Sequence, residues 1–175
     1  PEGRVALESV ALVMVSGMAS TRKTRSVSLA PIHADDTCCR LNAMRAHLTS
    51  VCPSAEVDAF QHLPSSVVAF ARELSARDLL TAHSHRRGQL LYAVDGVMQV
   101  RTPQGVWLVP PHRALWVPPQ VEHEILMLTR VSMRTLYIDE RQGQALGAQC
   151  RLLEVSVLLR ELILALLAEP REYAP

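Results

Sequence analysis

Short apolar segments recur at intervals of roughly ten residues through the middle of this chain, and residues that favour turns lie between them. Asp95-Gly96 is a strong signal for a tight hairpin, while Pro110-Pro111 and Pro118-Pro119 interrupt the later segments. This punctuation predicts an antiparallel β-sandwich or barrel. The strands that we expect are residues 89–95, 97–101, 106–109, 114–117, 123–128 and 131–138.

The interior of such a barrel follows from the alternation of side chains along each strand. With 49% apolar residues, a chain of 175 residues can form one domain with a substantial core. We expect that core to include Leu91, Met98, Val100, Leu108 and Leu126.

Three histidines stand near the ends of the expected strands. His83 and His85 are separated by one residue, and His123 follows the turn Pro118-Pro119-Gln120. Residues i and i+2 of a strand share a face, so His83 and His85 can point together into the barrel. Three imidazoles that converge on one cavity would suit a divalent metal or an anionic ligand.

These residues resemble the two motifs of the cupin family. The first motif supplies His-x-His, a carboxylate and a glycine that closes a hairpin; the second supplies Pro-x-Gly and a third histidine. The resemblance covers about residues 66–140 and implies a double-stranded β-helix, or jelly-roll barrel. Two positions depart from the pattern, because Gln89 stands at the carboxylate and Gln120 at the turn glycine. The matching positions are His83, His85, Gln89, Gly96, Pro118, Gln120 and His123.

The cupin resemblance also implies a set of metal ligands. The cofactor stays unidentified, and a divalent transition metal is the candidate that histidines suit. The implied ligands are His83, His85, Gln89 and His123.

The sequence between the two motifs resembles the N-terminal sensing domain of AraC-type bacterial transcription regulators. It reads His-Ser-His-Arg-Arg-Gly-Gln-Leu-Leu-Tyr-Ala-Val, then Trp-Leu-Val-Pro-Pro, then Arg-Ala-Leu-Trp-Val-Pro-Pro. The resemblance implies a small-molecule effector inside the barrel. For Trp116, core packing is the alternative to a stacking role, and for Arg87 a surface charge is the alternative to ligand binding. The expected ligand-binding residues are His83, His85, Arg87, Tyr92, Trp116 and His123.

The C-terminal part predicts a strand and then a helix. Residues 150–155 form the expected strand, Ser156 can cap the helix, and the helix begins near Leu158. Apolar residues recur through the helix as one broad stripe. Part of this stripe would pack on the barrel, and the rest would pair with a second copy in a homodimer. The expected dimerisation residues are Leu159, Leu162, Ile163 and Leu166.

We therefore divide the chain into three parts. Residues 1–55 are a flexible or misassigned N-terminal extension, 56–140 the cupin-like sensing domain, and 141–175 a strand-helix dimerisation and linker segment. The resemblance implies that a helix-turn-helix domain follows in AraC-type regulators; we expect it to be absent from this chain, so contact with DNA would depend on that domain.

Charge and cysteines indicate the compartment and exclude some functions. The net charge of +1 gives no general attraction to nucleic acid. The four cysteines lack disulfide or zinc spacing, which is typical of free thiols in the cytoplasm. The apolar segment 10–15 is too short to span a membrane, so we expect no membrane partner.

Two functions compete. The first is a non-enzymatic module that binds an effector, dimerises and controls DNA binding. The second is a small metal-dependent cupin enzyme, an oxygenase or isomerase. Iron oxygenases use two histidines and a carboxylate. Because Gln89 replaces that carboxylate, the sequence favours the regulator.

Overall fold

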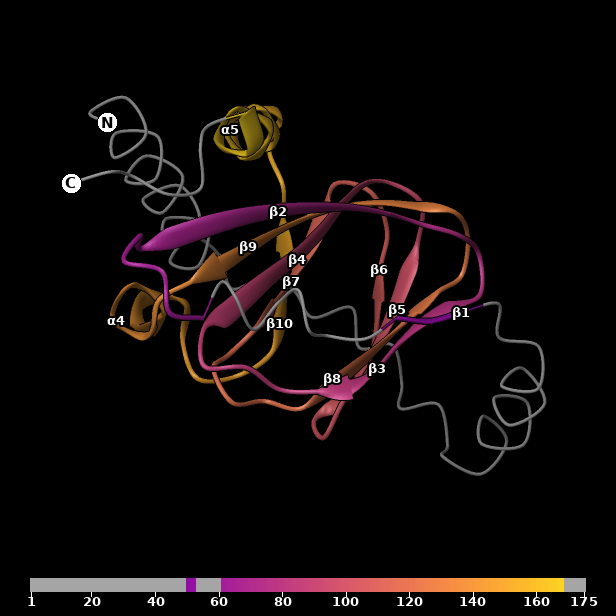
Figure 1. Cartoon of the computed structure of the whole chain (residues 1–175), viewed down its shortest axis with the longest axis horizontal. Coiled ribbons are helices and arrows are strands. Elements are labelled where there is room, and N and C mark those ends of the chain that lie inside the picture. The colour runs from indigo at the N-terminus through magenta and orange to yellow at the C-terminus, as the bar shows by residue number, and fades with distance from the viewer. Residues whose placement is uncertain (1–49, 53–60, 169–175) are drawn as a thin grey trace.

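Two facing five-stranded sheets form a barrel, and the helix α5 (Val157–Ala168) packs on its outside (Figure 1). The computed structural model describes residues 50–52 and 61–168. The first sheet contains β1 (Ser50–Cys52), β3 (Asp78–His83), β8 (His123–Met127), β5 (Met98–Thr102) and β6 (Gly105–Val109), in that order. The second contains β10 (Arg151–Glu154), β7 (Arg113–Val117), β4 (Gly88–Asp95), β9 (Val131–Ile138) and β2 (Val67–Leu74), in that order.

The strand pairing confirms the predicted cupin-like double-sheet barrel. Every pair in the second sheet is antiparallel, and β4 lies between β7 and β9. The hairpin at Asp95-Gly96 also forms, with Gly96 at a φ of 87°. A Cβ at Gly96 would lie 2.1 Å from the Arg130 carbonyl oxygen, so this turn requires glycine.

Strand β1 lies inside the segment that we expected to be an extension. Ser50, Val51 and Cys52 pair in parallel with Asp78, Leu79 and Leu80 of β3. These three residues therefore belong to the first sheet, which is a correction to the expected boundary at residue 55. The other residues of the expected extension, 1–49 and 53–55, lie outside the described residues.

Four of the five core residues predicted from the sequence are buried, but only three of them point into the barrel interior, because Leu126 pairs with Gln99 and points to the outer face of the first sheet. Leu91, Met98 and Val100 are fully buried, and Leu126 is 8% exposed. The prediction that Leu108 is buried was wrong, because 53% of its surface is exposed.

The position of Leu108 follows from the register of the first sheet. Val100 pairs with Trp107 and Met98 with Val109, so these side chains of β6 point inward. Leu108 pairs with Gln99 and points to the outside of the edge strand. The run Val-Trp-Leu-Val is apolar on both faces, and its sequence alone does not reveal which face is buried.

A second apolar layer lies between the second sheet and α5 (Val157–Ala168), which crosses the outer face of β2 and β9 (Figure 1). The Ser156 hydroxyl accepts a hydrogen bond from the Leu159 backbone N–H at 3.2 Å, as predicted for the helix cap. Among the described residues, no helix has the length and apolar character needed to cross a membrane.

Two short elements, α4 (Glu140–Gly143) and η1 (Gln144–Leu146), follow β9 at one end of this layer. Trp116 packs in the layer, and its indole N–H donates to the Gly147 carbonyl at 2.9 Å. Gly88 permits the close contact of Trp116, because a Cβ at Gly88 would lie 2.0 Å from the indole ring.

Candidate functional site

The pairing of β3 with β8 brings two of the predicted histidines together. His83 ends β3 and His123 begins β8, and they are direct partners in the antiparallel register. Directly paired residues point to the same face. The two rings consequently lie with their centroids 4.5 Å apart.

His85 reaches the same place from the link between β3 and β4. It lies outside both strands, so it does not share a strand face with His83 as we expected. The Gln120 backbone N–H instead donates to the His85 carbonyl at 2.9 Å. This bond joins the turn before β8 to the link that carries His85. Gln120 holds a φ of 62°, the left-handed conformation for which the cupin motif uses glycine.

Gln89 lies at the centre of a buried polar group. Its Oε1 is 3.0 Å from Nε2 of His85 and 3.0 Å from Nε2 of His123. Its Nε2 donates to the hydroxyls of Thr135 and Tyr137, each at 3.1 Å. Gln89 is 2% exposed, His123 1% and His85 6%, so the whole group is shielded from water.

Backbone carbonyls fix the tautomer of all three rings. Nδ1 of His83 lies 2.7 Å from the Thr81 carbonyl oxygen. Nδ1 of His85 lies 2.6 Å from the Arg87 carbonyl oxygen, and that of His123 lies 3.0 Å from Val121. Because a carbonyl only accepts, each Nδ1 carries the proton. In a neutral ring, Nε2 is then a bare acceptor.

Burial keeps the two inner rings neutral. Burial lowers the pKa of His123 to about 3, and the neighbouring His83 and His85 also lower it. Burial also lowers the pKa of His85, against the opposing effect of its hydrogen bond to the Arg87 carbonyl. Burial likewise raises the pKa of the Tyr137 hydroxyl, so this group stays protonated.

Three acceptor atoms therefore face one another: Nε2 of His85, Nε2 of His123 and Oε1 of Gln89. Two arrangements satisfy them. In one, these residues would hold a divalent cation, because imidazole nitrogens and an amide oxygen are metal ligands. In the other, the amide is turned so that its NH₂ donates to both rings and its oxygen accepts from the Tyr137 hydroxyl, while the Thr135 hydroxyl donates its proton to the Leu90 carbonyl.

The donor set thus fits a divalent transition metal. The ligand atoms of His83, His85 and His123 lie within 4.8 Å of one another. Gln89 is placed to add a neutral oxygen. The sequence-predicted set of three histidines and Gln89 is brought together.

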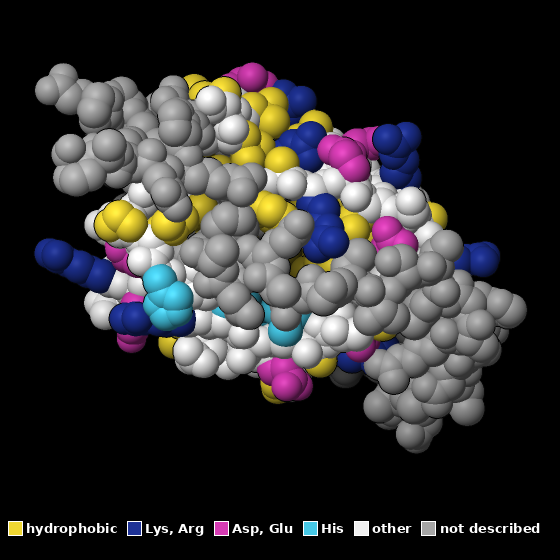
Figure 2. Space-filling view, viewed as in Figure 1, with side chains coloured by type: hydrophobic (Ala, Val, Ile, Leu, Met, Phe, Trp, Pro, Cys, Tyr) yellow, Lys and Arg dark blue, Asp and Glu magenta, His cyan; other side chains and the backbone are white. Residues whose placement is uncertain are grey.

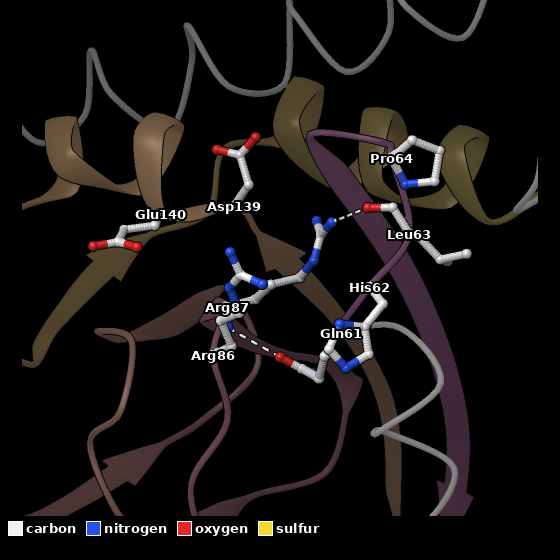
Figure 3. A pocket seen from close by; sticks show the side chains of 8 residues that line it. All are labelled: Gln61, His62, Leu63, Pro64, Arg86, Arg87, Asp139 and Glu140. Atoms are coloured by element: carbon white, nitrogen blue, oxygen red, sulfur yellow. Dashed lines mark hydrogen bonds between the residues drawn. The ribbon is translucent and has the colours of Figure 1, made fainter.

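Arg87 is placed differently from our expectation. Its guanidinium donates to the Ser65 carbonyl at 2.8 Å and to the Leu63 carbonyl, and its backbone N–H donates to the Gln61 side chain (Figure 3). Arg87 is 5% exposed. These hydrogen bonds join the segment before β2 to the start of β4. The exposed Arg86 borders the neighbouring hollow of about 320 Å³ together with Asp139 and Glu140.

Tyr92 and Trp116 lie on the opposite face of the second sheet from the histidines. Along β4, Gln89 and Leu91 point inward and Leu90 and Tyr92 outward. Trp116 pairs with Leu90 and points the same way. Both aromatic residues pack in the layer under α5, so the structure does not bring them to the histidine cluster.

The four residues that we expected to form a dimer contact are engaged within the chain. Leu159, Ile163 and Leu166 are at most 1% exposed and pack on the second sheet, and Leu162 is partly buried there. The apolar stripe of α5 therefore packs on the second sheet of the same chain. On the side seen in Figure 2, hydrophobic side chains gather over α5, whose Val157 and Leu158 are 78% and 55% exposed.

Thr135 and Tyr137 were not predicted from the sequence. Tyr137 pairs with Gln89 in the register of β4 and β9, and its ring centroid lies 5.1 Å from that of His85. The sequence signal was that Thr135 and Tyr137 lie on the same strand face as Val131 and Met133. That shared face points to the histidine cluster only once the register between β4 and β9 is known.

Comparison with known proteins finds a matching family and a curated relative. Residues 66–173 match the AraC-like ligand binding domain. The HTH-type transcriptional regulator NimR of Escherichia coli (strain K12) is 34% identical over 102 residues, which cover 58% of this chain and 37% of NimR. The chain thus spans 37% of the length of that relative.

Solved structures are similar to parts of this chain at low identity. The ToxT protein of Vibrio cholerae is 8% identical, with a TM-score of 0.49, over 62% of this chain and 49% of that chain. An RmlC-like cupin from Shewanella frigidimarina is 20% identical, with a TM-score of 0.40, over 45% of this chain and 71% of that chain.

Proposed function

The chain belongs to the AraC-like ligand binding domain family, and on that premise we propose that it is the effector-sensing domain of a bacterial, cytoplasmic transcription regulator. The match from residue 66 to 173 carries this proposal, because it includes the barrel from its second strand onward and the helix α5. NimR, the curated relative, is an HTH-type transcriptional regulator. A separate helix-turn-helix domain would contact DNA, and this domain would catalyse no reaction.

The effector site that we propose is the group around Gln89. Polar side chains in a barrel interior are costly unless their hydrogen-bonding atoms have partners, and here six of them converge. His83, His85, Gln89 and His123 would hold a divalent transition metal, with Thr135 and Tyr137 behind the amide. The metal would supply a Lewis-acidic centre to which an effector can coordinate.

Metal binding would reverse the Gln89 amide. Without an ion, the NH₂ of Gln89 would donate to His85 and His123. With an ion held by these residues, Oε1 would face it and the NH₂ would keep the hydrogen bonds to Thr135 and Tyr137 that the structure shows. The site would then have two discrete states, which a sensing domain requires.

The second sheet offers a route from this site to α5. Gln89 and Thr135 face the interior, and the Thr135 hydroxyl donates to the Leu90 carbonyl at 3.0 Å. Their chain neighbours Leu90 and Leu136 belong to the layer that α5 covers. A small shift of β4 or β9 on binding would thus move the surface on which α5 rests.

We also propose a homodimer, as a two-fold regulator of paired DNA sites would form. The residues of α5 left for that contact are Val157 and Leu158 at its start. Light scattering tests this: Leu158→Glu should dissociate the dimer. A dimer that survives the substitution would place the contact elsewhere.

A metal-dependent enzyme is the second candidate, and the inward-facing cluster of three histidines is the observation that favours it. The two functions differ in what happens to the ligand. A sensing domain binds and releases the compound unchanged, whereas an oxygenase or isomerase converts it.

A thermal-shift screen of small metabolites, with and without added Zn²⁺, tests the sensing function. Hits on the wild type should lose their effect in His85→Ala/His123→Ala and keep it in His62→Ala, whose side chain is exposed. Chromatography of each hit after incubation with the protein should recover it intact. Conversion of the compound would instead establish the enzyme.

A further inference from the structure

Among the described residues, no carboxylate belongs to the ligand atoms of the cluster; the carboxylates that line the hollow beside His123 are those of Glu122, which is exposed, and Glu124. Among residues 61–168, the side chains grouped as metal ligands are three histidines without a carboxylate. Gln89 occupies the position of the cupin carboxylate and is neutral. Glu124 follows His123 on β8 but alternates to the other face, where its carboxylate lies 3.9 Å from the Arg101 guanidinium.

A divalent ion held by these groups would keep both of its positive charges. Histidine binds a metal as neutral imidazole, and a glutamine oxygen adds only a dipole. The surroundings are shielded from water, because His85, Gln89 and His123 are 6%, 2% and 1% exposed. An uncompensated charge in such a place is strongly unfavourable. A ligand that brings negative charge would remove this penalty.

The walls next to the cluster are apolar. Val117 pairs with Gln89 across β7 and β4, and Leu91 and Ile125 follow Gln89 and His123 on the same strand faces. All three are fully buried. The remainder of a ligand bound here would meet hydrocarbon, which favours an organic anion over a bare inorganic one.

From this placement, and resting on the proposed function, we infer that the effector is a small organic carboxylate. Its charged end replaces the carboxylate that Gln89 lacks, and its apolar part packs on Leu91, Val117 and Ile125. The replacement of a glutamate by glutamine in the motif thus specifies an acid as the ligand.

Cobalt absorption spectra test this inference. The protein is loaded with Co²⁺, and the visible absorption bands are followed during titration with butyrate or with butyramide, its neutral counterpart. Butyrate should bind at least tenfold more tightly than butyramide. Gln89→Glu, which supplies the missing charge, should weaken butyrate at least tenfold. Gln89→Met adds no charge and should retain the preference for butyrate over butyramide. Gln99→Glu adds the charge outside the barrel and should retain this preference as well.

The outcomes separate the two proposals. Failure of the wild type to take up Co²⁺ by calorimetry would overturn the metal site and the inference with it. Uptake of Co²⁺ with equal affinity for butyrate and butyramide would overturn the inference alone. Equal butyrate affinity in the wild type and Gln89→Glu would also overturn it. If Gln89→Glu does not fold, Gln89→Met still decides, because loss of the preference for the acid there would show that the amide, and not the charge, selects the ligand.

Discussion

Acidification of the metal-free protein should reduce its stability through His123. The folded pKa of this ring is lowered to about 3 by burial, against an ordinary value of 6.5. Between these values the unfolded chain binds a proton that the folded chain does not, so the stability is fully present above pH 6.5 and falls as the pH falls. Each pH unit costs about 1.4 kcal/mol, and the change from pH 6.5 to 4 costs on the order of 3 kcal/mol.

Urea unfolding of EDTA-treated protein at pH 4, 5, 6 and 6.5 measures this loss. His123→Gln should flatten the pH dependence by about 1 kcal/mol per unit, whatever its effect on stability at pH 6.5. His62→Gln removes an exposed ring and serves as the matched control. Equal slopes for the wild type and His123→Gln would refute the assignment of His123 as a buried, neutral ring.

Three further predictions follow from the fold. Gly88→Ala should lower stability by about 1–3 kcal/mol in urea unfolding, because its Cβ would lie 2.0 Å from Trp116. Leu159→Ala should cost about 2–5 kcal/mol and Glu161→Ala less than about 0.5, because only Leu159 is buried; equal losses would contradict the orientation of α5. Arg87→Met should cost about 2–4 kcal/mol in thermal or urea unfolding, because it leaves buried carbonyls without donors; an unchanged midpoint would contradict this role.

Turn chemistry made the strands of the barrel predictable. Asp95-Gly96, Pro110-Pro111 and Pro118-Pro119 mark the ends of strands locally, and 131–138 is observed as expected at β9. The convergence of three histidines was predictable for a similar reason, since the two motifs carry it. How His85 reaches the other two histidines was not predictable. Its position depends on the backbone hydrogen bond between Gln120 and His85, which joins two segments that are distant in the sequence.

The side to which a residue points was harder to predict. β4 reads Gly-Gln-Leu-Leu-Tyr-Ala-Val-Asp, and its apolar residues occupy both faces because the barrel core covers one face and α5 the other. Alternation therefore could not show that Tyr92 points away from the histidines. The same limit applies to Trp116. Arg87 was missed because its partners are backbone carbonyls of Leu63 and Ser65, which have no sequence signal.

The central claim is that an effector binds inside the barrel at Gln89 and not on the helix-covered face. Gln89 and Tyr92 lie on the same strand and point to opposite faces, so they form a matched pair of tests. The decisive measurement is calorimetric titration of the best compound from the screen into the wild type, Gln89→Ala and Tyr92→Phe.

We predict binding of one molecule per chain that is weakened at least tenfold in Gln89→Ala and unchanged in Tyr92→Phe, because only Gln89 contacts the histidine cluster. An affinity unaffected by Gln89→Ala, or lost in Tyr92→Phe alone, would contradict the account.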